Sequence, residues 1–244
     1  MTENPYLGID SCSYGWVSFI LNQKQWDIEI FRDINSIWKK YYDAKLMLID
    51  IPIGLRSEGG KARLCDIAAR KYLTKKRSSS IFPTPCRKAL DASSYKEANK
   101  INKKITGKGL SKQTYNIMPK IKEVDMLLRK VGHASKIIIE SHPEVCFTAL
   151  NSEKPLEYYK KTKKGIKQRL SLLNSFSNYK NNPLDFAKKN FKRNKLAIDD
   201  VLDAWILAIS ASMGKSALKF LPKAFEFDKK ELPMRIAFSN FKAH

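Results

Sequence analysis

Five acidic residues of this chain stand where an apolar segment ends or an apolar helix begins. They are Asp10, Asp50 and Glu140, each after a short apolar run, and Asp200 and Asp203 in a late apolar helix. Carboxylate oxygens are the ligands that hard cations such as Mg²⁺ prefer in proteins. Phosphoryl transfer with two metals needs carboxylates that hold two divalent ions about 4 Å apart. The pattern therefore predicts a Mg²⁺ or Mn²⁺ site suited to phosphodiester chemistry.

Different tasks are expected of these carboxylates. Asp10, at the end of a central strand, should bridge two ions, and Asp50 on the neighbouring strand should hold one of them. Asp200 and Asp203 are three residues apart and share a helix face, so either side chain could reach the strand ends. We predict these four aspartates as metal ligands and Glu140 as an assisting catalytic residue. Taken singly, each could instead be a turn residue, a strand terminator or a helix N-terminal residue.

Positive charge is concentrated in two middle segments of the chain. The formal net charge is +22, yet residues 1–70 hold nine basic and nine acidic residues. Residues 71–136 hold 17 Lys and Arg against 4 Asp and Glu, and residues 154–195 hold 13 against 2. Phosphate contacts dominate non-specific affinity for nucleic acid, so this distribution predicts a DNA or RNA partner. The alternative is a lysine-rich solvated surface.

Composition limits the class of protein. The 244 residues, 43% of them hydrophobic, suffice for one large domain or a domain with insertions. No apolar run approaches the roughly 18 residues that span a membrane, and residues 1–5 lack the basic and apolar regions expected of a signal peptide. The four cysteines lie far apart without a C-x-x-C pair, which argues against structural zinc and indicates reduced thiols. We therefore expect a cytoplasmic protein without a membrane partner.

Hydrophobic periodicity predicts a mixed α/β fold. Strands are expected over 5–10, 16–21, 26–31, 45–51 and 136–140, and helices over 33–43, 60–73, 94–104, 112–131 and 196–212. Residues 71–136 and 154–195 are expected as basic helical insertions of a single domain at 1–212. Residues 213–244 carry no clear pattern and are expected as a C-terminal extension. This order is that of the RNase H-like fold, a mixed five-stranded sheet flanked by helices, with a helical insertion.

Basic and polar residues of the insertions are candidates for substrate binding. In the predicted helix 60–73, the residues expected to face inward are Leu64, Ile67, Ala68 and Leu73. Arg63 and Arg70 share a helix face and could grip a phosphate, although Asp66 and Arg70 could simply form an i, i+4 pair. His142 could position a water or contact a phosphate, or serve as a turn residue before proline. The remaining candidates near the substrate are Lys108, Lys112, Gln113 and Lys120.

Several motifs together resemble one family. They are Gly8–Cys12 with Gly15–Trp16, Asp50–Leu55, Arg63–Asp66 with Ala69–Arg70, Ser79–Pro85, Gly107–Gln113, Pro119–Ile121 with Glu123–Asp125, Glu140–Glu144, Lys161–Gly165 and Asp199–Ala204. The chain resembles the predicted RNase H-like nucleases catalogued as domain of unknown function 429, over about residues 5–212. Residues 200–204 also resemble the last helix of RuvC-like resolvases, where two aspartates at this spacing bind metal.

The resemblance implies Asp10, Asp50, Asp200 and Asp203 as the acidic site of a Mg²⁺- or Mn²⁺-dependent nuclease. Two other functions stay open: a nucleic-acid-binding protein without catalysis, and a metal-dependent phosphohydrolase acting on a small nucleotide. Because RuvC-like enzymes that cut paired strands are dimers, a homodimer is one expected state. These motifs do not distinguish a DNA substrate from an RNA substrate, or a single strand from a duplex.

Overall fold

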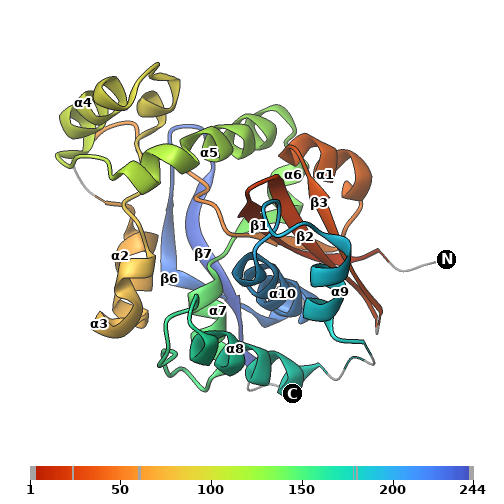
Figure 1. Ribbon diagram of the computed structural model, residues 1–244. Helices are drawn as coiled ribbons and strands as arrows, with labels where there is room; N and C mark the ends of the chain where they lie inside the picture. Colours follow the sequence, from red (N-terminus) through yellow and green to blue (C-terminus); the bar gives the residue numbers. More distant parts are fainter. Residues whose placement is uncertain (1–3, 24, 60–61, 178, 180, 242–244) are drawn as a thin grey trace.

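The computed structural model describes residues 4–23, 25–59, 62–177, 179 and 181–241 (Figure 1). Its main sheet has the strand order β3-β2-β1-β4-β5, in which β1 pairs antiparallel with β2 and parallel with β4. β2 and β3 are antiparallel, and β4 and β5 are parallel. The strands are β1 (Tyr6–Cys12), β2 (Gly15–Asn22), β3 (Gln25–Phe31), β4 (Leu46–Ile49) and β5 (Ile138–Glu140). The predicted mixed five-stranded α/β sheet is thus confirmed.

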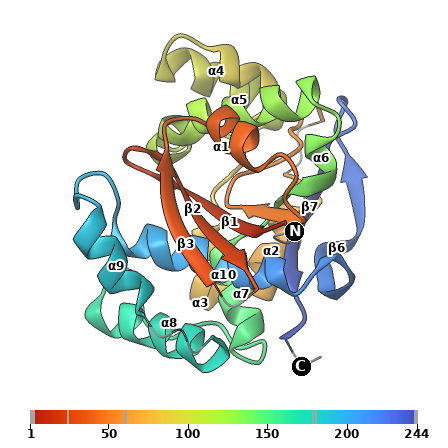
Figure 2. The same cartoon turned by 90° about the vertical axis from the view of Figure 1, so that its right-hand side faces the viewer.

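Helices cover both faces of this sheet (Figure 2). The longer helices are α1 (Ile34–Tyr41), α2 (Leu64–Tyr72), α4 (Tyr95–Thr106), α5 (Lys112–Lys130), α7 (Pro143–Leu150), α8 (Lys163–Phe176), α9 (Pro183–Asn190) and α10 (Ile198–Ser212). Short turns of helix are α3 (Thr74–Arg77), α6 (Ala134–Ile137), η1 (Ser78–Ser80), η2 (Arg87–Asp91) and η3 (Lys215–Ala217). Among the described residues, none of these helices combines the length and apolar character needed to cross a membrane.

Side-chain alternation divides the interior into two cores. Along β4, Met47 and Ile49 pack with α1 and α5, whereas Leu46 and Leu48 pack with α10. Successive strand residues point to opposite faces, so both faces of this buried strand are apolar. β1 divides in the same way, with Leu7 and Ile9 on the α5 side. The two sides are called the α5 face and the α10 face below.

The described part of the predicted helix 60–73 begins at Leu64, and residues 60 and 61 lie outside the described residues. Its orientation differs from the prediction. Leu64 is 46% and Ile67 51% exposed, whereas Asp66 is buried. The predicted inward face was wrong for Leu64 and Ile67, because a buried network of charges, described below, holds Arg63 and Asp66 inside, whereas the prediction is confirmed for Leu73, which is fully buried.

The C-terminal residues form a second, two-stranded sheet that the sequence pattern did not reveal. β6 (Leu218–Phe227) and β7 (Pro233–Ser239) pair antiparallel, with an irregularity between Leu221 and Glu226. β6 packs on α2, and β7 packs on α7 and β5. Ser141, directly after β5, bridges to Ala237 of β7. The hairpin therefore supports the end of the main sheet.

Candidate functional site

Asp10 and Asp50 are brought together by the register of two parallel strands. Ile9 pairs with Ile49, and the Asp50 amide donates to the Ile9 carbonyl at 2.9 Å, so each aspartate follows a paired residue. Alternation then points both side chains to the α10 face, because Leu48 lies there and Asp50 is two residues further. Asp10 is 6% exposed and Asp50 is half-buried.

Gly8 controls how closely α10 approaches this pair. A Cβ atom at Gly8 would lie 2.0 Å from the Ala204 carbonyl oxygen and 2.2 Å from the Ala208 nitrogen. Only a residue without a side chain allows such contact between a strand and a helix backbone. Asp203, one residue before Ala204, is 2% exposed, and its charge acts on Asp10.

Asp200 has a local structural contact besides its place in the site. Its Oδ2 accepts from the Ala197 amide at 3.2 Å, so it caps the first turn of α10. The neighbouring charges of Asp203 and Lys160 also act on its pKa, which burial raises to about 6. Asp10, Asp50, Asp200 and Asp203, here called the aspartate cluster, thus come from β1, the end of β4 and α10.

The carboxyl groups of the aspartate cluster have raised pKa values. Burial raises the pKa of Asp10 well above its usual range, and the charges of Asp50 and Asp203 raise it further. Burial also raises the pKa of Asp50, and that of Asp203 to about 6, while Lys160 opposes both shifts. Buried carboxylates with few counter-charges favour either protonation or a bound cation. Such perturbed groups in one place are typical of functional sites.

Lys160 is a residue of this site that the sequence patterns did not single out. Its Nζ lies 2.5 Å from Asp203 Oδ2 and 3.9 Å from Asp199 Oδ2. Burial alone lowers the pKa of Lys160, but the charges of Asp203, Asp10 and Asp50 outweigh this and raise it. The ammonium therefore stays charged among the carboxylates.

Glu140 lines one small cavity together with Asp50, but its side chain lies on the other face of the sheet. It pairs with Ile49 in the parallel register, one position before Asp50, and alternation places it with Ile138 on the α5 face. Its Oε1 accepts from Arg63, and its Oε2 accepts from Arg63 at 2.8 Å and from the Ile53 amide at 2.7 Å. Our expectation of a catalytic Glu140 is replaced by a structural role, because both oxygens already have partners.

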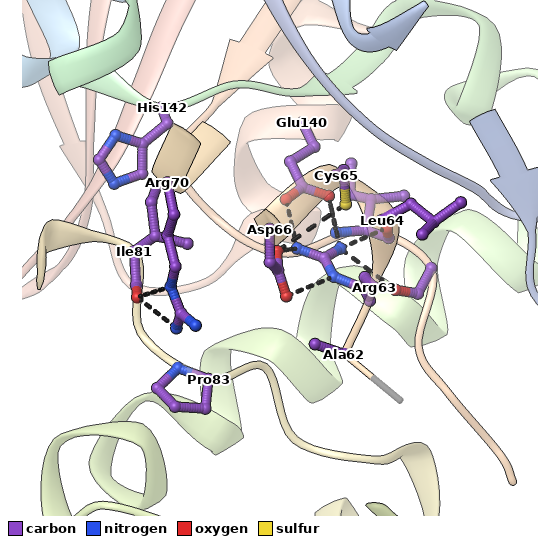
Figure 3. Close-up of polar contacts among 12 residues, drawn as sticks. Ala62, Arg63, Leu64, Cys65, Asp66, Arg70, Ile81, Pro83, Glu140 and His142 are labelled. Atoms are coloured by element: carbon purple, nitrogen blue, oxygen red, sulfur yellow. Dashed lines mark hydrogen bonds and ion pairs between the residues drawn. The ribbon is translucent and has the colours of Figure 1, made fainter. Parts of the chain in front are cut away.

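Arg63 is the centre of this second group of charges (Figure 3). The guanidinium donates to Asp66, to Glu140 and to the carbonyl oxygens of Ile53 and Gly54, which together use its N–H groups on all three nitrogens. Arg63 is 2% exposed. The expected grip of Arg63 on a phosphate is thus replaced by a structural role in what we call the arginine network: Arg63, Asp66 and Glu140.

The arginine network also offers ligand atoms in metal-like proximity. Sγ of Cys65 and one carboxylate oxygen each of Asp66 and Glu140 lie within 4.8 Å of one another. The aspartate cluster does not meet this spacing among the described side chains, and holds Lys160 instead. A metal at the arginine network would displace a guanidinium bound on every nitrogen, so the bound cation there is Arg63 itself.

Arg70 and Lys108 lie beyond this network, around a cavity of about 30 Å³ that Thr84 also lines. Arg70 donates from Nε at 3.1 Å and from Nη2 at 2.7 Å to the Ile81 carbonyl (Figure 3). Asp66 pairs with Arg63 rather than forming the alternative pair with Arg70. Arg70 and Lys108 therefore lie together at one cavity, and Asp50 and His142 line a neighbouring one. Arg63 and Asp66 line both cavities.

Two predicted residues flank the aspartate cluster more directly. Lys120 of α5 donates to the Gly15 carbonyl, lies 4.6 Å from the ring centroid of Trp16, and is influenced by the charge of Asp10. Burial lowers the pKa of Lys120. His142 lies 3.4 Å from the Ser80 carbonyl through Nε2, and its charge lowers the pKa of Asp50. Nδ1 of His142 is buried and has no hydrogen-bond partner within the described part of the chain.

Lys112 and Gln113 begin α5, away from these contacts. The Lys112 ammonium lies 3.9 Å from the ring centroid of Tyr95, and Gln113 is exposed. Ser111 caps the helix by accepting from the Thr114 amide. Both predicted substrate residues thus lie on the surface of the first basic segment, where they could meet a long ligand but not the aspartates.

In chemical type, the donor atoms of the aspartate cluster suit a hard divalent cation, although their spacing in this structure is wider than that of the arginine network. The candidate ligands of the aspartate cluster are carboxylate oxygens, and Asp10, Asp50 and Asp203 exceed the single ammonium of Lys160 in charge. All four cysteines are buried free thiols. Burial raises the pKa of the Cys12 and Cys146 thiols, and the charges of Asp200 and Asp50, respectively, raise them further, so neither thiol is favoured as a metal-binding thiolate. Oxygen-only coordination suits Mg²⁺ or Mn²⁺ rather than zinc.

Comparison with known proteins identifies the family. No curated protein matches the chain, and no solved structure matches it. The profile of the family described as "Protein of unknown function (DUF429)" matches residues 8–224, which include the whole aspartate cluster and the arginine network. The chain therefore belongs to the DUF429 family.

Proposed function

We propose that this protein is a nuclease that hydrolyses phosphodiester bonds of nucleic acid with Mg²⁺ or Mn²⁺, on an RNase H-like fold. The observation that carries the proposal is the gathering of four aspartates from three elements on one face of the sheet, with one lysine to balance them. The strand order β3-β2-β1-β4-β5 with antiparallel β2 supports the fold assignment. Two cations held here by Asp10, Asp50 and Asp203 would supply charge to activate water and stabilise the leaving oxygen.

The basic segments support a polymeric substrate. In Figure 2, α4 and α5 of the first segment lie on one side of the sheet, and α8 and α9 of the second lie on the other. Each segment sends one lysine toward the aspartates, Lys120 from α5 and Lys160 from the connection before α8. Lysines on both sides of a site can hold successive phosphates of one strand.

Cleavage of a substrate panel tests the proposal. The panel holds single-stranded and duplex DNA, RNA, an RNA–DNA hybrid, a four-way junction and a small nucleotide, each with Mg²⁺, Mn²⁺ or EDTA. We expect metal-dependent cutting of at least one polymer, lost by about 10³-fold or more in Asp10→Asn and Asp203→Asn because each removes a buried ligand. Asp43→Asn, at an exposed aspartate, is the matched control and should cut normally.

Other outcomes identify the competing functions. Salt-sensitive binding of nucleic acid that both variants retain, without cutting, would replace the nuclease by a binding protein. Hydrolysis of the small nucleotide alone would replace it by a metal-dependent phosphohydrolase. Cutting by the wild-type protein in EDTA, or equal cutting by Asp10→Asn, would contradict the proposed role of the cluster.

A further inference from the structure

Hydrogen bonds to neighbouring residues fix the backbone at Lys160. It lies in the connection between α7 and α8, two residues before Thr162, the N-cap of α8. The carbonyls on its N-terminal side are fixed: Arg169 donates to Tyr158 at 3.2 Å, and Thr162 donates to Tyr159 at 2.8 Å. Because the backbone before Lys160 is fixed by these hydrogen bonds, the Lys160 ammonium is held beside the aspartate cluster as part of the fold.

Gly165 shows how tightly this turn is packed. A Cβ atom at Gly165 would lie 2.0 Å from the Tyr159 carbonyl oxygen. Arg169, which is fully buried, also donates to the Gly165 carbonyl and pairs with Glu144 of α7. Gln168 accepts from the amides of Glu157 and Tyr158, both at 3.2 Å. The contacts of the first two turns of α8 thus fix the backbone at residues 157–159, directly before Lys160.

The ammonium already occupies a cation position. Asp203 Oδ2 accepts from Lys160 at 2.5 Å, while Asp203 is 3% and Lys160 31% exposed as side chains. Charge effects of Lys160 reach Asp10, Asp50 and Asp200 as well. A divalent ion bound to the same oxygen would lie about 2.1 Å from it, close to a like charge in a partly buried place. The two cations therefore exclude each other at Asp203 Oδ2.

We propose that Lys160 takes one of the two cation positions of the aspartate cluster, so that the cluster binds a single divalent ion. The proposal rests on the proposed metal-dependent function and replaces its second ion by a residue of the chain. Lys160 then has the role of the second cation toward a bound phosphate, with one charge instead of two. Metal loading, rather than activity, distinguishes this arrangement from a two-metal site.

Titration with Mn²⁺, followed by the paramagnetic resonance of free Mn²⁺, measures the number of ions per chain. We expect one ion for the wild-type protein and two for Lys160→Met, which keeps a side chain of similar length without the charge. Lys161→Met, at an exposed lysine in the same turn, is the matched control and should bind one ion. Lys160→Arg retains the charge and should also bind one, which guards against a misfolded Met variant.

The outcomes separate this inference from the proposed function. Two ions in the wild-type protein, two in Lys160→Arg, or one in a folded Lys160→Met would overturn the role of Lys160 and leave a metal site in place. Absence of Mn²⁺ binding in both the wild-type protein and Lys160→Met would overturn the metal-dependent function and the inference with it.

Discussion

Buried carboxylates on the two faces of the central sheet have very different partners. On the α5 face, Glu140 and Asp66 share Arg63, whose N–H donors on all three nitrogens are used. On the α10 face, the aspartate cluster shares one ammonium. Burial raises the pKa of carboxyl groups on both faces, to about 7 for Glu140 and to about 6 for Asp203, so the number of positively charged partners is what differs. A satisfied network stabilises a fold, whereas one short of positive charge is ready for a ligand. The aspartate cluster and the arginine network are both acidic and buried, and they differ in how completely positive charge neutralises their carboxylates.

The largest effect should come from breaking the satisfied group. Arg63→Ala leaves Glu140 and Asp66 buried without their cation, and loss of one partner of a buried pair costs about 3–5 kcal/mol. We expect the free energy of unfolding in urea to fall by about 4 kcal/mol. Lys71→Ala, at an exposed position of the same helix, is the control and should stay within about 0.5 kcal/mol. A loss below about 1 kcal/mol in Arg63→Ala would contradict a structural role.

Gly8→Ala tests the backbone contact on which the aspartate cluster depends. The added methyl group meets the Ala204 carbonyl at 2.0 Å, so α10 must move away from β1. We expect a loss of about 3 kcal/mol in unfolding free energy and weaker Mn²⁺ binding, because Asp203 moves with the helix. Gly132→Ala is the matched control, because a Cβ atom at that position would meet no atom within 4 Å. Unchanged stability and metal affinity in Gly8→Ala would show that the approach of α10 is not limiting.

The aspartate cluster was accessible from the sequence because it depends on short-range rules. Apolar runs that end in Asp10 and Asp50 identify neighbouring buried strands, and the spacing of Asp200 and Asp203 identifies one helix face. Glu140 ends a similar run, but a register one residue earlier turns its side chain to the other face. Register between parallel strands is a tertiary property that the run itself does not encode.

Other parts of the molecule were hidden for related reasons. Lys160 is one lysine of a basic stretch, and its place follows from where Thr162 and Gly165 begin α8. Leu64 and Ile67 were expected inside, but the pairing of Arg63 with Glu140, far away in the sequence, turned α2 the other way. The irregularity between Leu221 and Glu226 interrupts the alternation by which β6 could be recognised. Long-range pairing decided the orientation of α2, whereas local backbone geometry decided the other two cases.

The smallest effect on the free energy of unfolding is expected for Asp10→Asn, and it is a gain rather than a loss. Asp10→Asn removes a buried negative charge next to Asp50 and Asp203. Because burial and these neighbours raise the pKa of Asp10, its ionisation costs stability above the ordinary pKa of an aspartate, and that cost disappears as the pH falls. We expect Asp10→Asn to stabilise the metal-free protein at pH 7 by about 1 kcal/mol, and by less near pH 4.

Thermal unfolding in EDTA at both pH values measures this difference, with Asp185→Asn at an exposed aspartate as control. Added Mn²⁺ should reverse the order at pH 7, because the wild-type protein gains from binding and Asp10→Asn loses a ligand. Destabilisation by Asp10→Asn in EDTA would mean that Asp10 is as well neutralised as Glu140. The difference between the two faces of the sheet would then lie in geometry alone, and Lys160 would suffice to balance the aspartates without any ion.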